Sequence, residues 1–255
     1  MRPLLSTRLL STTCCSTDGL RLARNAGFPW LELRSDSVGV DLFRVGEVAR
    51  VARALAAEGT RAAWLQVGPD VTGRLGEPAA LQRFGEVLGE LRLEGVTVVG
   101  PLGNADPGEL LAQAELAGAR LCLERGAFSG AEVRRWPRAV DLGWDLAAAS
   151  TASLGDLDRF LGEVPPGRLL AVRVSGRDAA GRRIPPGEHE AVLLEEAWRR
   201  LRPGYVIYDV EDPSGFGAAT SLDGVLARLR AFHAGELHPH ATAPWGLFGS
   251  SLAPG

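Results

Sequence analysis

The sequence predicts an α/β protein folded as a single (β/α)8 TIM barrel. Two observations carry this prediction: short apolar segments rich in β-branched residues recur along the 255 residues, and segments with helical periodicity lie between them. Barrels of this length are ordinary single domains. A doubly wound open sheet would usually carry a glycine-rich phosphate-binding turn after its first strand, and LSTRLLSTTCCSTDG is not such a turn. We expect the barrel over residues 1–240 and a C-terminal tail over residues 241–255.

Eight segments are expected to form the strands of the barrel. Most of them are continuously hydrophobic, which is typical of parallel strands covered on both faces. Their spacing of about 20 to 36 residues is a normal range for a βα unit. The expected strands are Leu4–Thr7, Trp30–Arg34, Ala62–Val67, Val96–Gly100, Arg120–Glu124, Ala139–Asp145, Leu169–Ser175 and Tyr205–Glu211.

Four segments between these strands have the pattern of amphipathic helices. In the first of them, Val48, Val51 and Leu55 fall on one face, and Gly59 follows the last turn as a C-terminal cap. Pro78 suits the start of the second. The expected helices are Gly46–Gly59, Glu77–Gly95, Asp106–Gly118 and Glu190–Gly204.

Composition and charge exclude several classes of protein. The net charge is −3 and there is no run of basic residues, so no nucleic-acid partner is expected. All 28 basic residues are arginine, and a Schiff base needs an amine that can lose its proton. Lysine-dependent aldolases, pyridoxal-phosphate enzymes and Walker-type phosphate loops are therefore excluded.

No segment is apolar for long enough to predict a signal peptide or a membrane span, so a cytoplasmic protein with no membrane partner is expected. The three cysteines cannot form a disulfide framework. Cys14 and Cys15 follow the first strand with no histidine near them in the sequence, and we interpret the pair as incidental.

Acidic residues gather where the expected strands end, which is where the active site of such a barrel forms. Crowded carboxylates are unfavourable unless a cation, a proton or an arginine lies between them. One interpretation is a divalent metal held by Glu124, Asp145 and Glu211, since hard cations prefer carboxylate oxygen. The other is that each acid pairs with an arginine, for which the candidates are Arg34, Arg125, Arg173 and Arg177.

Several motifs follow one another along nearly the whole chain: MRPLLST, LARNAGFPWLELR, LCLERG, LGWDLAAAS, AVRVSGRDAAGRRIPPGEHE and RPGYVIYDVED. In this order and spacing they resemble the sugar phosphate isomerase/epimerase group, the xylose isomerase-like barrels. The resemblance implies a divalent cation (Mn²⁺, Mg²⁺, Co²⁺ or Zn²⁺) that polarises a ketose or aldose while two glutamates move a proton. By position, Glu124 and Glu211 match the catalytic glutamates and also metal ligands, and Asp145 matches the ligand aspartate. The residues expected to contact the substrate are Glu32, Arg173, Ser175, Asp178 and His189.

The seventh strand departs from the pattern of that group. Arg173 and Ser175 stand where the group usually has His-x-His, and Ala148 stands where a further histidine is expected. A guanidinium at position 173 can neutralise a carboxylate without a metal, through bidentate pairs with Glu124 or Glu211. If Arg173 replaces the metal, no cofactor is needed, and the site becomes a salt-bridge network or takes an anionic ligand.

Three functions are open at this point. The leading one is an isomerase or epimerase acting on a small polyol, ketose or sugar acid, in a chain that pairs as a homodimer. The alternative is a catalytically degenerate barrel that binds an anionic ligand or a protein partner without turnover. An abasic-site endonuclease is disfavoured, because it needs clustered zinc-binding histidines and a basic surface, and the four histidines are scattered: His189, His233, His238 and His240.

Overall fold

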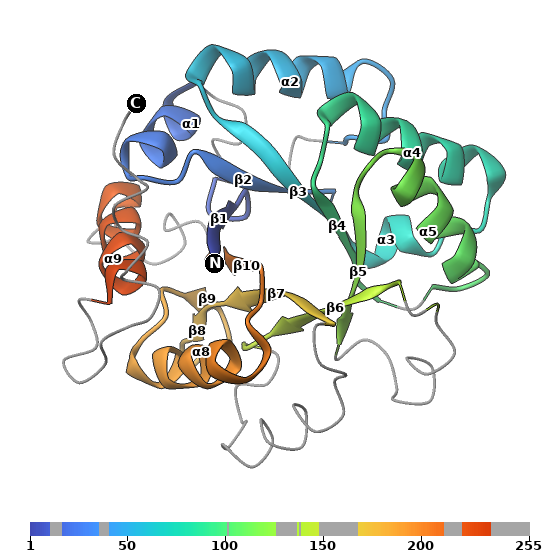
Figure 1. Ribbon diagram of the computed structural model, residues 1–255. Helices are drawn as coiled ribbons and strands as arrows, with labels where there is room; N and C mark the ends of the chain where they lie inside the picture. Colours follow the sequence, from blue (N-terminus) through green and yellow to red (C-terminus); the bar gives the residue numbers. More distant parts are fainter. Residues whose placement is uncertain are drawn as a thin grey trace.

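Eight parallel strands close into a barrel, and the order around it is β1-β10-β7-β6-β5-β4-β3-β2 (Figure 1). The computed structural model describes residues 1–10, 17–35, 41–100, 102–125, 137, 139–147, 168–211 and 221–235. The predicted (β/α)8 barrel is confirmed, and each of the eight expected segments overlaps a barrel strand. These strands are β1 (Arg2–Ser6), β2 (Trp30–Arg34), β3 (Arg61–Val67), β4 (Gly95–Val98), β5 (Arg120–Arg125), β6 (Asp141–Asp145), β7 (Leu169–Val174) and β10 (Tyr205–Tyr208).

Helices surround the barrel on its outside (Figure 1). They are α1 (Thr17–Asn25), α2 (Glu47–Glu58), α3 (Pro69–Thr72), α4 (Pro78–Leu91), α5 (Pro107–Leu116), α8 (Glu188–Leu201) and α9 (Leu222–Ala234). The four predicted helices are confirmed, and α2 buries Val48, Val51 and Leu55 as its pattern predicts. Gly59 ends α2 in the left-handed conformation, with φ 63°, and its N–H bonds to the last turn. Within the described ranges, no helix has both the length and the apolar composition that a membrane span requires.

A small apolar cluster fills the inside of the barrel, separate from the larger core between strands and helices. Its centre is Trp64, whose Nε1 donates to Thr97 Oγ1 at 2.7 Å. The Trp64 ring lies over Gly95, where an added Cβ would come within 2.4 Å of the ring, so glycine leaves the space that the indole needs. The buried members of the cluster are Leu4, Ala63, Trp64, Cys122, Leu170, Ala171 and Ile207. The interior below the strand ends is therefore packed with side chains.

Stacked side chains cover the N-terminal end of this cluster. The Arg2 guanidinium lies 4.7 Å from the centre of the Trp30 ring and bonds to Glu94. Tyr205 donates to the same carboxylate at 2.7 Å, and its ring packs against Trp64. This end of the barrel is occupied by cation–π and charge-assisted contacts.

His233 is a core residue of α9. Its Nδ1 lies 2.9 Å from the hydroxyl of Tyr208 on β10, and both side chains are buried. Burial lowers the pKa of His233 to about 4, because the charged imidazolium would lose its hydration. His238 and His240 lie outside the described residues.

We predict that acid weakens the fold through His233. The pKa of this group in the folded protein, about 4, lies below its ordinary value of 6.5, so the unfolded chain takes up the proton first as the pH falls. The free energy of unfolding should therefore fall from pH 6.5 towards pH 4, by about 2–3 kcal/mol at pH 4.5. Urea unfolding at pH 7 and pH 4.5 should show a smaller loss in His233→Gln than in the native sequence. An equal loss in the two proteins would contradict the assignment.

Candidate functional site

The inward side chains of the barrel change from apolar to charged towards the C-terminal ends of the strands. Alternate residues of a strand face the same side, so a residue two positions after a member of the interior cluster lies above that cluster. The pairs that show this change are Trp30 and Glu32, Cys122 and Glu124, Ala171 and Arg173, and Ile207 and Asp209. Glu32, Glu124 and Asp209 thus lie in one layer with Arg173. Asp145, the last residue of β6, and Arg34, two residues after Glu32 on β2, belong to the same layer, and all of these residues except Glu124 are buried.

Arg173, on β7, connects three acids of this layer. Its Nη1 and Nη2 donate to the two carboxylate oxygens of Glu32, each at 2.6 Å, and its Nε donates to Glu124 at 3.2 Å. Its Nη1 also lies 3.5 Å from Asp209 Oδ2. Burial alone would lower the pKa of Arg173, but the three carboxylates raise it well above its ordinary value, so the guanidinium stays charged.

Asp209, directly after β10, is fully buried and is surrounded by arginines. Arg8 Nε donates to its Oδ1 at 2.8 Å. Three guanidinium nitrogens lie 3.3–3.5 Å from its Oδ2, from Arg34, Arg173 and Arg183. Burial would raise the pKa of Asp209, but the arginines hold it well below the ordinary value, so the carboxylate is charged. Among the described residues Oδ2 accepts no hydrogen bond, although it is completely buried.

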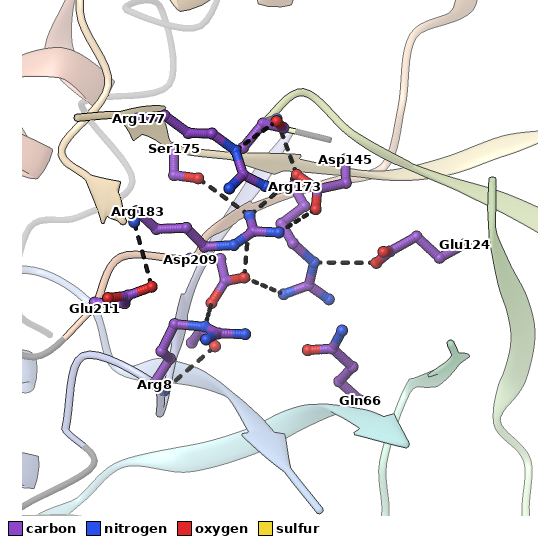
Figure 2. Close-up of polar contacts among 12 residues, drawn as sticks. Arg8, Gln66, Glu124, Asp145, Arg173, Ser175, Arg177, Arg183, Asp209 and Glu211 are labelled. Carbon is purple, nitrogen blue, oxygen red and sulfur yellow. Dashed lines mark hydrogen bonds and ion pairs between the residues drawn. The ribbon is translucent and has the colours of Figure 1, made fainter. Parts of the chain in front are cut away.

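Arg183 enters the layer from a two-stranded hairpin that follows β7, formed by β8 (Gly176–Arg177) and β9 (Arg183–Ile184). Its Nη1 donates to Asp145 Oδ1 and to Ser175 Oγ, both at 3.1 Å, and its Nη2 donates to Asp145 Oδ2. Figure 2 shows this guanidinium between Asp145 and Asp209. The Ala147 N–H donates to Asp145 Oδ1 at 2.9 Å, so both oxygens of this carboxylate are engaged.

Glu124, on β5, is held less tightly than the other inner acids. Its carboxylate receives one bond of 3.2 Å from Arg173, and its side chain is 12% exposed. Burial raises the pKa of Glu124, and Arg173 offsets part of this effect while the neighbouring acids add to it, so the net shift is upward. Glu124 is therefore a carboxylate that reaches the mouth of the barrel and takes up a proton more readily than a free glutamate.

Glu211 lies beside the hairpin. Its N–H donates to the carbonyl oxygen of Arg183 at 3.0 Å, and its Oε1 accepts from the Arg183 N–H at 3.3 Å. Both contacts are with backbone, so Glu211 anchors β9 to the end of β10. Its predicted role as an acid/base residue stays a prediction.

Two residues expected to contact a substrate lie elsewhere. Asp178 closes the hairpin turn: its Oδ1 accepts from the N–H groups of Ala180 and Arg182, and its Oδ2 accepts from Arg182 Nε at 2.7 Å. His189 lies exposed in the first turn of α8. The structure thus gathers Glu32, Glu124, Asp145, Arg173 and Ser175 of the expected set, and no observation tests the roles assigned to them.

Other expectations fall on parts of the chain outside the described residues. These are Cys14, Cys15, Ala148 and the tail over 241–255, together with the side chain of Arg125. Arg177, a candidate partner for an acid, donates instead to the carbonyl oxygens of Ala147 and Gly181.

No role in the site was predicted from the sequence for Arg8, Asp209 or Arg183, although Asp209 is one of the acids at the end of the eighth expected strand. Asp209 could have been found from alternation, because it shares its face with Ile207. Arg183 gives no such signal, since it lies eight residues beyond the seventh expected strand in a loop rich in arginine.

The residues expected to hold a divalent metal do not fit that role in this arrangement. Arg183 engages both oxygens of Asp145, Arg173 engages Glu124, and Glu211 bonds to the hairpin backbone. In the part of the chain that the structure describes, no three His, Cys, Asp or Glu side chains are grouped so that they could hold a metal ion. The interpretation in which arginines neutralise the acids agrees better with the geometry.

Solved structures share this fold. A xylose isomerase domain-containing protein from Salmonella typhimurium LT2 is 14% identical, with a TM-score of 0.64 over 91% of this chain and 96% of the other. D-psicose 3-epimerase, in a structure with D-fructose, is 16% identical, with a TM-score of 0.63 over 93% and 99%. A xylose isomerase-like TIM barrel protein from Mycobacterium smegmatis in complex with magnesium is 14% identical, with a TM-score of 0.61 over 99% and 98%. No protein-family model and no curated protein matches the sequence. The chain therefore has the xylose isomerase-like TIM barrel fold, as the resemblance implied.

Proposed function

We propose that this barrel binds a small, neutral, carbohydrate-like molecule at the C-terminal mouth without a divalent metal. The observation that carries the proposal is that guanidinium groups engage the inner acids, including two that were expected to hold a cation: Arg173 with Glu124 and Arg183 with Asp145. Guanidinium groups offer only donors and carboxylates only acceptors. The layer contains both kinds of group side by side. It can therefore bind vicinal hydroxyls, since each hydroxyl both donates and accepts a hydrogen bond.

The charge balance favours a neutral ligand over an anionic one. The layer holds four acids and four arginines, so a further anion gains no net attraction from it. The members are Glu32, Glu124, Asp145 and Asp209 with Arg8, Arg34, Arg173 and Arg183. Neutral polyols and ketoses gain hydrogen bonds from such a site without adding a charge to it.

Solved structures of the same fold support the class of ligand, since one of them is a D-psicose 3-epimerase in the presence of D-fructose. Metal-dependent proton transfer is not part of the proposal, because the carboxylates expected to hold the metal are already engaged. Glu124 is the acid of the layer best placed to contact a ligand, since its side chain reaches the mouth.

Calorimetric titration with ketoses, aldoses and polyols, after dialysis against EDTA, tests the proposal. We expect a neutral sugar or polyol to bind with an affinity that EDTA does not change. Glu124→Gln should weaken binding about ten-fold or more, because a hydrogen bond to a charged group is worth about 1.5–3 kcal/mol. Glu86→Gln, on the outer face of α4, is the matched control and should bind normally. The proposal fails if no neutral compound binds, or if binding disappears in EDTA and returns with Mn²⁺.

A further inference from the structure

The cation that meets Asp145 is carried by a hairpin and not by a barrel strand. Arg183 lies on β9, whose two residues pair with β8: Gly176 with Ile184 and Arg177 with Arg183. The turn is closed by Asp178, and backbone contacts with Glu211 tie β9 to the barrel. The hairpin thus holds one guanidinium over the strand ends.

Two buried carboxylates lie beneath this guanidinium. Asp145 is 2% exposed and Asp209 is fully buried. Arg183 bonds to both oxygens of Asp145 but reaches Asp209 Oδ2 only at 3.3 Å, without a hydrogen bond. The nitrogen that lies nearest Asp209 Oδ2 is Nη1, and its two N–H groups already donate to Asp145 and Ser175.

A compact cation would suit these ligands better than the planar group does. Two carboxylates and the Ser175 hydroxyl are hard oxygen ligands, which small divalent cations prefer. Such an ion has no directional donors. Without Arg183 the layer would hold four acids and three arginines, so a cation beside Asp145 and Asp209 would restore the charge balance, although Arg34 and Arg173 also lie 3.5 Å from Asp209 Oδ2. The Arg183 guanidinium occupies the position beside Asp145 and Ser175 and so excludes a free cation. Because the guanidinium is part of the chain, its effective concentration at this position is high.

We infer that Arg183 is a tethered cation that fills a latent cation site formed by Asp145, Asp209 and Ser175. The site takes a divalent metal ion, or a free guanidinium ion, once the side chain is removed. The sequence indicated Arg173 as the residue that replaces a metal ion, but the guanidinium of Arg173 donates to Glu32 and Glu124. This cation site lies at the same mouth of the barrel as the proposed carbohydrate site. Cation binding does not depend on carbohydrate binding and is tested without a saccharide.

The test compares Arg183→Ala with Arg182→Ala, which removes the neighbouring arginine that pairs with Asp178 at the surface. Thermal unfolding is followed with MnCl2 and, separately, with low-millimolar guanidinium chloride. Arg183→Ala should show a saturable rise in Tm of several degrees with Mn²⁺, guanidinium or both, because an ion that binds the folded state stabilises it. The native sequence and Arg182→Ala should show no such rise.

Two further variants complete the test. Arg183→Lys keeps a positive charge at position 183, and its Tm should not rise with either ion. Adding Asp145→Asn to Arg183→Ala should abolish the rise, because it removes one of the two acids. If Arg183→Ala does not fold, Arg183→Gln replaces it, since the amide still donates to Asp145. The inference is overturned if the folded variant shows no saturable rise with either ion, or if the native sequence responds equally.

Discussion

Replacing Asp209 by alanine should lower the free energy of unfolding by about 3–5 kcal/mol, the range for breaking a buried ion pair from one side. The carboxylate is fully buried and faces four arginines, of which Arg34 and Arg173 are themselves buried. Without it, those guanidinium groups lie close together in a layer that has lost a counter-charge. Guanidinium chloride unfolding at pH 7, followed by circular dichroism, measures the effect.

Asp223→Ala is the control for this prediction. Asp223 lies exposed in the first turn of α9, and its loss should cost no more than about 0.5 kcal/mol. A cost for Asp209→Ala as small as that of the control would contradict the role given to Asp209. The pKa of Asp209 is held below its ordinary value of 3.8, so its stabilising contribution is present above that pH and is lost only in stronger acid.

Replacing Arg173 by methionine should also cost about 3–5 kcal/mol, because it leaves Glu32 buried without the cation that donates to both of its oxygens. Adding Glu32→Leu should recover part of this loss, since an apolar pair buries no uncompensated charge. The same unfolding experiment on the two single variants and the double variant gives the coupling free energy. Strict additivity of the two single costs would show that Glu32 and Arg173 do not stabilise each other.

The barrel could be predicted because its signals are local. Most strands are continuous apolar segments, and the predicted helices have a face set by spacing, as Val48, Val51 and Leu55 show. The helix α9 was not predicted although Val225, Leu229 and Phe232 have helical spacing, and the one-turn α3 is too short to leave a pattern. The β8–β9 hairpin has strands of two residues, and side-chain contacts of Asp178 close its turn.

The site was predicted in part for the same reason. Strand ends and alternation indicate which acids face inward, and the pairing of Arg173 with Glu124 was among the expectations that the structure shows. The stronger partner of Arg173 is Glu32, which lies 141 residues away in the chain and gives no sequence signal. The contact of Arg183 with Asp145 likewise depends on how the hairpin folds back over the barrel.

The resemblance also directed attention to Glu211 as an inner acid. The structure instead places Asp209 in the buried layer, because β10 ends at Tyr208 and Glu211 already pairs with the hairpin backbone. The alternation of β10, from Tyr205 through Ile207 to Asp209, would have favoured Asp209. The motifs indicated the fold and contain Arg34, Arg173 and Arg183, but the order of residues within them does not show which acid each arginine contacts.

Elemental analysis of untagged, freshly purified protein tests whether arginines, and not a divalent metal ion, neutralise the acids at the mouth of the barrel. We expect no stoichiometric divalent metal in the native sequence, and the same result in Glu124→Gln. Close to one metal ion per chain in the native sequence, lost in Glu124→Gln, would contradict this expectation.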